Sequence, residues 1–326
     1  MAAVAPPTTW HQHPNPRPHP ASSTFTPPPP PQTRPHGRFQ YASPLATRDI
    51  PIPLPPRNEK ELTRELLITI LDYFATLIPA HFNGLPLRLV VHGGACMLLH
   101  PGLYNLAKQQ EYLSARSHSR SHSSPHSKLP RRISTRDVDY IHRSFVAEWH
   151  ALGVMDAEER IRRCIRLTAG HFGLGADWMN ADADVALPMA LDAHGKQYDP
   201  IYHSALQPHN VALHTVYTAP NGLLRLISVP PVWSIALKLV RYTKYDPGDI
   251  CLLLRNGTNL NNVHWTPATL ASWLRTDAAP MSFELWTAAK LHELHERIRH
   301  AIGGVEAWEG EGQRDGQGQG REARGR

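Results

Sequence analysis

The sequence predicts a mixed fold of the α+β (mixed α/β) class, and three features of the chain indicate it. Apolar residues recur at helical spacing over 58–77 and 156–173, whereas short runs typical of strands stand at 87–91 and 133–141. After residue 230 the apolar periodicity is helical. Helices and strands that alternate first and then give way to helices favour a small mixed sheet flanked by helices, followed by a helical C-terminal part.

The two ends of the chain are not expected to join that fold. Residues 1–57 contain runs such as "PPPPPQ" and "PIPLPP", which prefer polyproline II or disorder. The Gly/Arg/Glu tail at 303–326 is low in apolar residues and is also predicted to be disordered. Between them we expect an α/β core at 58–230, with a disordered Ser/His/Arg insertion at about 114–132, and a helical part at 231–302 packed on the core.

The formal net charge of +6 at pH 7 belongs mainly to segments outside the predicted fold. Residues 1–57 carry five arginines and one aspartate, and residues 114–132 carry five basic residues and no acidic one. The folded part is therefore slightly acidic, which argues against a basic nucleic-acid platform. Basic arms can still make weak, salt-sensitive contacts with RNA or acidic partners, although solvated flexible segments are the simpler interpretation.

Cysteine usage and hydropathy indicate the compartment. Cys96, Cys164 and Cys251 match neither a disulfide framework nor a zinc spacing, so we expect buried free thiols in a reducing environment. No apolar run reaches the roughly 18 residues of a membrane span, and the N-terminal stretch lacks the apolar core of a signal peptide. A cytoplasmic or nuclear protein is expected, neither secreted nor held in a membrane.

The first predicted elements lead to a glycine turn. We expect a helix from near Asn58 to Leu77, a buried strand over Leu87–Val91, and a tight turn at Gly93 and Gly94. A helix over 95–100 follows, which the next proline interrupts or ends. A glycine turn at a helix N-terminus lets backbone N–H groups approach an anion, although such turns often mean only close packing.

Two aspartates stand in the next predicted strand. Asp137 and Asp139 lie in "RISTRDVDYI", among residues typical of strands, where aspartate is depleted. Residues i and i+2 of a strand share a face, so the two carboxylates are expected side by side, where they repel unless a cation or proton lies between them. Their oxygens suit Mg²⁺; an exposed edge strand with solvated acids is the alternative.

The remaining elements complete the predicted order. They are a helix over 156–173, a short β-like run "ADVALP" at 183–188, and a hairpin turning at Pro220-Asn221-Gly222. Helices follow in "PVWSIALKLVRYT", "DPGDICLLLRNG", "TPATLASWLRT" and "MSFELWTAAKLHELHERIRHAI". Trp178 is expected in the core rather than stacked on a base. His292 and His295 lack a further ligand, so a surface helix explains them better than a metal site.

A third motif combines basic and acidic residues in the helical part. The stretch "ALKLVRYTKYDPGDICLLL" places Lys238, Arg241 and Lys244 ahead of Asp246 and Asp249. A salt-bridged helix face is the plain interpretation of this motif when it stands alone.

Taken in order, the three motifs resemble the nucleotidyltransferase superfamily with the polymerase-β-like palm, most closely its minimal branch related to abortive-infection toxins. That branch shows a Gly-Gly-Ala turn, a T-x-D-h-D strand and a later element with Lys followed by (R/K)-x-D-x-x-D-h. The matching residues here are Gly93-Gly94-Ala95, 135–139, and Lys238 with 244–250. The likeness covers about residues 60–256 without the insertion. Gly94 stands where many catalytic members carry a serine, which leaves backbone donors only.

The resemblance implies a palm fold and an enzyme that needs Mg²⁺ (or Mn²⁺). It would move a nucleoside monophosphate from an NTP to a hydroxyl of a protein or RNA acceptor. Asp137 and Asp139 would be catalytic residues and metal ligands, with Asp184 as the third carboxylate and Asp182 as its runner-up.

The same resemblance implies the nucleotide contacts. Gly93 and Gly94 would cradle the β- and γ-phosphates. Arg136 would pair with a phosphate or with a neighbouring acid, and Lys238 would reach a phosphate unless it faces solvent.

Two other functional classes remain open. The first is a catalytically inactive nucleotidyltransferase-like fold that serves as a binding or scaffold module, with the Pro-rich arm docking SH3- or WW-type partners and the insertion open to phosphorylation. The second is a nucleic-acid-binding protein that acts through its basic arms, with RNA binding that survives loss of both aspartates.

Overall fold

The structure is a computed structural model that describes residues 54–117, 129–261 and 263–322. The predicted Pro-rich arm up to residue 53, residues 118–128 of the predicted insertion and the last four residues of the tail lie outside the described residues.

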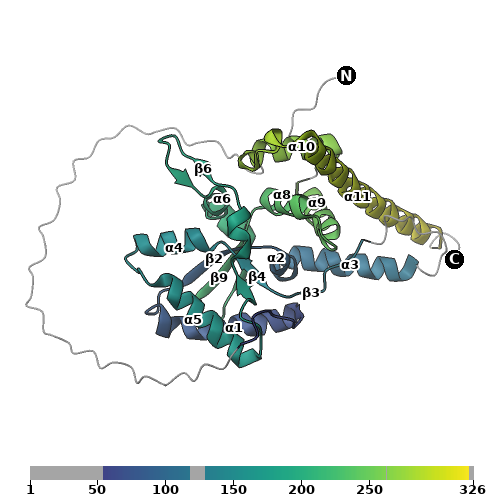
Figure 1. Ribbon diagram of the computed structural model, residues 1–326. Helices are drawn as coiled ribbons and strands as arrows, with labels where there is room; N and C mark the ends of the chain where they lie inside the picture. Colours follow the sequence, from purple (N-terminus) through teal and green to yellow (C-terminus); the bar gives the residue numbers. More distant parts are fainter. Residues whose placement is uncertain (1–53, 118–128, 262, 323–326) are drawn as a thin grey trace, which may run out of the picture. The chain divides into compact units, whose positions relative to one another are not determined.

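A five-stranded mixed sheet organises the first two thirds of the described chain (Figure 1). Its strands are β2 (Leu87–His92), β4 (Val138–Tyr140), β5 (Met179–Asn180), β8 (Thr215–Thr218) and β9 (Leu224–Ser228). The order across the sheet is β5-β4-β2-β9-β8. Strand β2 runs parallel to β9 and antiparallel to β4; β4 and β5 are parallel, and β8 and β9 form an antiparallel hairpin. The strand predicted at 87–91 and the hairpin are confirmed.

Helices surround this sheet and make up the rest of the chain. They are α1 (Arg64–His81), α2 (Gly94–Leu99), α3 (Pro101–Ser117), α4 (His142–Ala151), α5 (Ala157–Phe172), α6 (Pro200–Ala205), α7 (Pro208–His214), α8 (Pro231–Arg241), α9 (Asp246–Asn261), α10 (Pro267–Asp277) and α11 (Ala288–Glu322). Short 3₁₀ turns are η2 (Asp182–Ala186), η3 (Ala279–Met281) and η4 (Phe283–Leu285). Two small ladders pair β1 (Leu62–Thr63) with β3 (Ser134–Thr135), and β6 (Ala190–Leu191) with β7 (Gln197–Tyr198). The mixed α+β class is confirmed.

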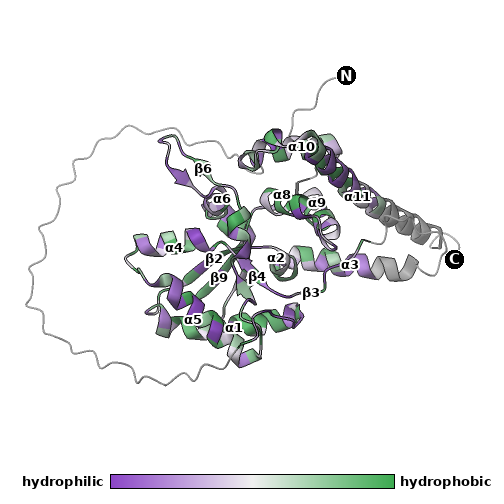
Figure 2. Cartoon of the chain, viewed as in Figure 1, coloured by the Kyte–Doolittle hydropathy of each residue, from purple (hydrophilic) through white to green (hydrophobic). Residues whose placement is uncertain are grey.

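The main hydrophobic core lies on one face of the sheet. Alternation along β2 sends Leu87, Leu89 and Val91 into this core, and Val138 and Tyr140 of β4 join them. Helices α1 and α5 pack against each other and close the core; both carry alternating hydrophobic and hydrophilic bands (Figures 1 and 2). The residues between these positions, His92 and Asp139 among them, therefore belong to the opposite face.

One of two helix boundaries differs from the prediction. Helix α1 begins at Arg64 rather than near Asn58, because Thr63 caps it by accepting a hydrogen bond from Leu66 N (3.4 Å). Asn58 instead donates its side-chain amide to the carbonyl of Arg136 (2.6 Å). The predicted interruption at Pro101 is confirmed: α2 ends at Leu99, and Pro101 is the first residue of α3, where a missing N–H costs nothing.

The predicted strand at 183–188 is wrong. Residues Asp182–Ala186 form the 3₁₀ turn η2, and the β-like residue Val185 is almost fully exposed. The reason is a polar contact: the Asp184 carboxylate accepts hydrogen bonds from the backbone N–H groups of His142 (2.9 Å) and Arg143 (2.8 Å) at the start of α4. Capping these orphan donors outweighs the β preference of Val185.

The prediction of a disordered tail from residue 303 is wrong over the described part. Helix α11 continues through it to Glu322, and Val305 and Trp308 are buried. They prolong the apolar face of Ile298 and Ile302 at spacings of three and four residues, a pattern that the glycine-rich composition hides. Gly304 is also buried, and a Cβ at this position would lie 2.7 Å from Cys251 Sγ, so glycine suits the close contact between α11 and α9.

Replacement of Val305 by alanine should lower the free energy of unfolding by about 1.5 kcal/mol, because buried methyl groups are lost from the α11 face. The exposed neighbour Glu306, replaced by alanine, is the matched control and should change stability by less than about 0.5 kcal/mol. Urea denaturation measures both variants. Equal, negligible effects would mean that the helix does not pack beyond residue 303.

No helix among the described residues is long and apolar enough to cross a bilayer.

Candidate functional site

The glycine turn is the centre of the candidate site. Strand β2 ends at His92, and Gly93 links it to α2 with a φ of 77° and a ψ of −149° that suit glycine almost alone. A Cβ at Gly93 would collide with the Asp139 carboxylate, and one at Gly94 would lie 2.7 Å from both Arg132 Nη1 and Thr135 Oγ1. Both glycines are therefore required by close approach, and the turn lies directly against the aspartate-bearing segment.

The sheet register places Asp139 at this turn. Asp139 is the Cα partner of His92 on β2, and on its other side it pairs with Asn180 of β5. Asp137 lies two residues earlier, just before β4 begins, and its backbone carbonyl accepts a hydrogen bond from Thr135 Oγ1 (3.2 Å). The prediction that both aspartates lie within a strand is thus correct only for Asp139.

The two carboxylates lie close enough to influence each other's ionisation. Burial, and then the charge of Asp139, raise the pKa of Asp137 to about 6. Burial also raises the pKa of Asp139, against the charges of Arg241 and Lys238, and Asp182 adds to the rise. Binding of a cation is favoured at two half-buried carboxylates with raised pKa values, because the cation offsets the repulsion between their charges.

Asp184, the predicted third carboxylate, has one of its two oxygens engaged in a helix cap. Its Oδ2 atom caps α4, as described above, and the Arg143 guanidinium bonds its backbone carbonyl (2.8 Å). The charge that reaches Asp139 from η2 is that of Asp182, the runner-up, whose side chain is exposed. The sequence could not separate the two, because the choice depends on which residue the N-terminus of α4 captures.

His92 is the buried neighbour that the sequence analysis did not single out. Its Nε2 atom and Asp184 Oδ1 are both buried without a hydrogen-bond partner in the described part of the chain. Burial lowers the pKa of His92 to about 4, against the charge of Asp184. A neutral imidazole therefore lies beside the aspartates and adds no positive charge to the site.

Lys238 neither faces solvent nor stands free to bind a phosphate. It lies on α8 with only 4% of its surface exposed, and its Nζ lies 2.7 Å from Asp249 Oδ2 and 3.6 Å from Asp246 Oδ1. Burial raises the pKa of Asp246, but the hydrogen bond from Arg241 and the charge of Lys238 outweigh it and lower that pKa to about 2. The third motif is thus a buried ion network whose net charge is close to balanced.

Arg136 and Arg132 differ in their contacts. Arg136, predicted to pair with a phosphate or with a neighbouring acid, has a side chain that is 66% exposed, and its Nε lies 3.5 Å from Glu61 Oε1, which agrees with the second alternative. Arg132, which the sequence analysis did not assign, reaches the turn itself: its Nε donates to Asp249 Oδ2 (3.0 Å) and its Nη1 is the atom beside Gly94. No local signal marks Arg132, because "LPRRIS" reads as the end of the insertion.

The donor set fits one divalent cation held by Asp137 and Asp139. Mg²⁺ commonly takes one or two carboxylates and fills its other positions with water and substrate phosphates. Within residues 54–117, 129–261 and 263–322, no group of three or more His, Cys, Asp or Glu side chains is arranged to hold a metal. The fit therefore relies on the two raised-pKa carboxylates and does not include Asp184.

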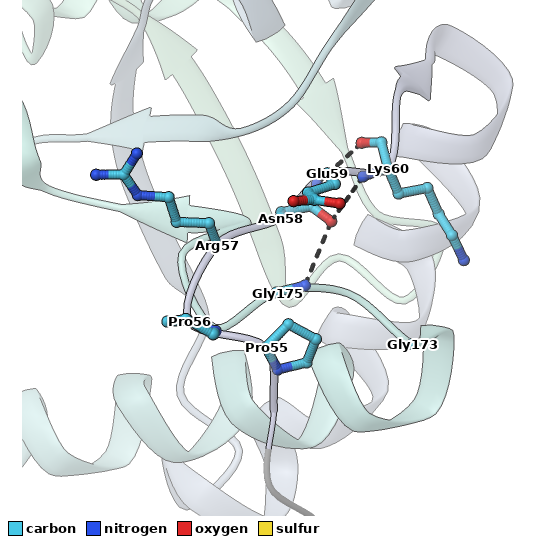
Figure 3. A pocket seen from close by; sticks show the side chains of 8 residues that line it. All are labelled: Pro55, Pro56, Arg57, Asn58, Glu59, Lys60, Gly173 and Gly175. Atoms are coloured by element: carbon cyan, nitrogen blue, oxygen red, sulfur yellow. Dashed lines mark hydrogen bonds between the residues drawn. The ribbon is translucent and has the colours of Figure 1, made fainter.

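A surface pocket lies apart from this turn (Figure 3). It is lined by Pro55, Pro56, Arg57, Asn58, Glu59, Lys60, Gly173 and Gly175. Asn58 Oδ1 accepts a hydrogen bond from Gly175 N (3.3 Å) within it, while Arg57 and Lys60 point away from each other. None of the predicted site residues lines the pocket.

Other predictions about single residues are settled by burial. Trp178 is fully buried and its Nε1 donates to the carbonyl of Ile165 (3.0 Å), so the core interpretation is confirmed. The three cysteines are free and buried, also as predicted. His292 is exposed on α11 and lies 3.7 Å from Glu296, which agrees with a surface helix.

Comparisons with known proteins return no match: no protein-family model, no curated protein and no solved structure shows significant similarity to this chain.

The pKa of Asp137 predicts a pH dependence of stability. Its folded value of about 6 lies above the ordinary value of 3.8, so between these values the folded chain binds the proton more tightly. The free energy of unfolding should therefore fall by about 1–2 kcal/mol as pH rises from 4 to 6, and Asp137→Asn should flatten this slope. Urea denaturation across the range measures it, with Asp192→Asn on the β6–β7 hairpin as control. An unchanged slope in Asp137→Asn would contradict the assignment.

Proposed function

We propose that the protein is a metal-dependent nucleotidyltransferase with a polymerase-β-like palm, which moves a nucleoside monophosphate from an NTP to a hydroxyl of a protein or RNA acceptor. The observation that supports it most is the juxtaposition of the Asp137–Asp139 pair with the Gly93–Gly94 turn, which residues far apart in sequence create.

The electrostatics of the site agree with this chemistry. Asp137 and Asp139 concentrate negative charge at one point, whereas Arg132 and Arg241 supply positive charge beside it. A triphosphate needs cationic groups along its length and a metal at the reacting phosphate. Arginines, and two carboxylates that would hold such a metal, lie near the same turn.

The chain's own residues would act by binding and positioning. Asp137 and Asp139 would hold the cation, which when bound neutralises charge on the phosphates and orients the attacking hydroxyl. The Gly93–Gly94 backbone would approach the phosphates without side-chain obstruction. Asp182, exposed on η2, would accept a proton from the acceptor hydroxyl, since the Oδ2 atom of Asp184 caps α4.

A second candidate function also has an observation in its favour. Asp184, expected as a catalytic carboxylate, and Lys238, expected to reach a phosphate, are both engaged in structural contacts. A nucleotidyltransferase-like fold without activity, kept as a binding or scaffold module, would show this pattern.

Calorimetric titration of Mg²⁺ with each NTP tests the two candidates without knowledge of the acceptor. We expect the wild-type protein to bind at least one NTP with micromolar affinity, and only when Mg²⁺ or Mn²⁺ is present. Asp137→Ala/Asp139→Ala should abolish this binding, because both carboxylates that hold the cation are removed.

A double replacement on an exposed helix face serves as control. Glu293→Gln/Glu296→Gln on α11 removes two carboxylates of the same charge away from the turn and should leave NTP binding unchanged. Absence of binding by folded wild-type protein would reject the enzyme and favour the scaffold module.

A further inference from the structure

We propose that Arg132 is the residue that binds the polyphosphate of the nucleotide at the Gly93–Gly94 turn, in place of Arg136 and Lys238. The identity of the anion as a nucleotide's polyphosphate rests on the proposed function. The existence of an anion site at the turn rests on the contacts of Arg132 alone.

Arg132 is held rigidly on one side. Its Nε donates to Asp249 Oδ2 (3.0 Å), and Asp249 is 1% exposed. The guanidinium lies 5.0 Å from the centre of the Tyr245 ring, an arrangement typical of a cation–π contact. Only 10% of the side chain is exposed, so its orientation is settled before any ligand arrives.

The other side of the guanidinium is available. Nη1 is the atom that a Cβ at Gly94 would meet at 2.7 Å, so it lies on the backbone of the turn. Within the described part of the chain neither Nη1 nor Nη2 is paired with an acceptor, and neither is among the polar atoms buried without a partner. Two donors of a fixed, charged fork thus lie at a glycine turn with no acceptor bound to them among the described residues, and such a fork can bind a phosphate through two hydrogen bonds.

The rival cations are less suited to this task. The Lys238 ammonium is buried between Asp249 and Asp246. Arg241 commits Nε and Nη2 to Asp246 (3.1 and 2.9 Å). Arg136 is largely exposed and has no buried anchor, so ordering it on a phosphate would cost side-chain entropy that Arg132 has already lost.

The glycine of the third motif, Gly248, also contributes to the position of Arg132. A Cβ at Gly248 would lie 2.6 Å from the carbonyl oxygen of Pro130, so only glycine lets the segment before Arg132 pass this close to α9. The acidic motif at the start of α9 therefore positions Arg132: Gly248 admits the segment and Asp249 orients the guanidinium.

Inorganic tripolyphosphate is the probe, because it carries neither base nor sugar and needs no acceptor. Calorimetric titration without metal should show binding to the wild-type protein, and Arg132→Gln should weaken it at least about tenfold, as expected for loss of a charge-assisted bidentate contact. Arg166→Gln on α5 is the control: it removes an arginine that pairs with Glu159, and it should change the affinity less than about twofold. An unchanged affinity in Arg132→Gln, or a larger loss in Arg136→Gln, would overturn the proposal.

A second measurement on the wild-type protein guards against a folding defect in Arg132→Gln. Phenylglyoxal modifies accessible guanidinium groups, and peptide mass spectrometry reports the rate at each arginine. Tripolyphosphate should slow modification of Arg132 several-fold and leave Arg166 unchanged; equal rates at Arg132 with and without the anion would reject the site.

The two proposals can fail separately. If tripolyphosphate protects Arg132 but no NTP binds with Mg²⁺, the anion site stands and the nucleotidyltransferase is rejected. If NTP binding depends on Asp137 and Asp139 but not on Arg132, the proposed function stands and this inference falls.

Discussion

Replacement of Lys238 by methionine is expected to lower the free energy of unfolding by about 3 kcal/mol, because it removes one partner of a buried ion network. The lysine Nζ lies 2.7 Å from Asp249 Oδ2, and Asp249 and Asp246 are 1% and 0% exposed. Arg132 and Arg241 still neutralise part of the charge, so we expect the lower end of the range for broken buried pairs. Urea denaturation monitored by circular dichroism measures the loss.

The control is an exposed ion pair of similar length. Arg162 Nη2 lies 2.6 Å from Glu158 Oε1 on α5, with both side chains about half exposed. Arg162→Met should cost less than about 0.5 kcal/mol, since exposed pairs contribute little. If Lys238→Met cost no more than Arg162→Met, the two arginines alone would balance the buried aspartates. The third motif would then not depend on its lysine.

Replacement of Gly93 by alanine is expected to impair both stability and nucleotide binding. Alanine is strained at a φ of 77° and ψ of −149°, which costs about 1–3 kcal/mol. Its Cβ would also displace the Asp139 carboxylate that lies against Gly93. We therefore expect the affinity for Mg²⁺ with NTP to fall at least about tenfold, a change of 1.4 kcal/mol in binding free energy.

Gly153 provides the matched control. It also has a positive φ, 84°, but a Cβ there would have no other atom within 4 Å. Gly153→Ala should destabilise the fold by about 1 kcal/mol and leave nucleotide binding unchanged, because only the backbone strain is shared. Equal effects of the two alanine variants on binding would show that the carboxylate's position against Gly93 is unimportant.

Apolar periodicity and turn residues predicted several helices and strands correctly. The strand at 87–91, the hairpin at Pro220-Asn221-Gly222 and the helix at 156–173 were all predictable from apolar spacing and turn residues. The prediction from composition was wrong where a high glycine content hides the apolar periodicity of a helix. The glycine-rich stretch after residue 303 is helical because Val305 and Trp308 continue a buried face.

The candidate site was predictable in part. Gly93 and Gly94 are recognisable from local sequence because glycine is typical of turns, and Asp139 is recognisable because aspartate is depleted in strands. Asp184 was predicted to be the third carboxylate and Lys238 to reach a phosphate, but in the structure Asp184 caps α4 and Lys238 pairs with Asp249. Sequence spacing does not show which polar group binds a given carboxylate.

By itself, therefore, the sequence determined the class of fold, the glycine turn and the aspartate beside it, since these depend on neighbours within a few residues. Tertiary structure alone decided that Arg132 and Asp249, 117 positions apart, meet at that turn, and that Asp184 caps a helix. The physical reason is that buried charges and helix ends take whichever partner the packing brings within about 3 Å, and no local pattern encodes that distance.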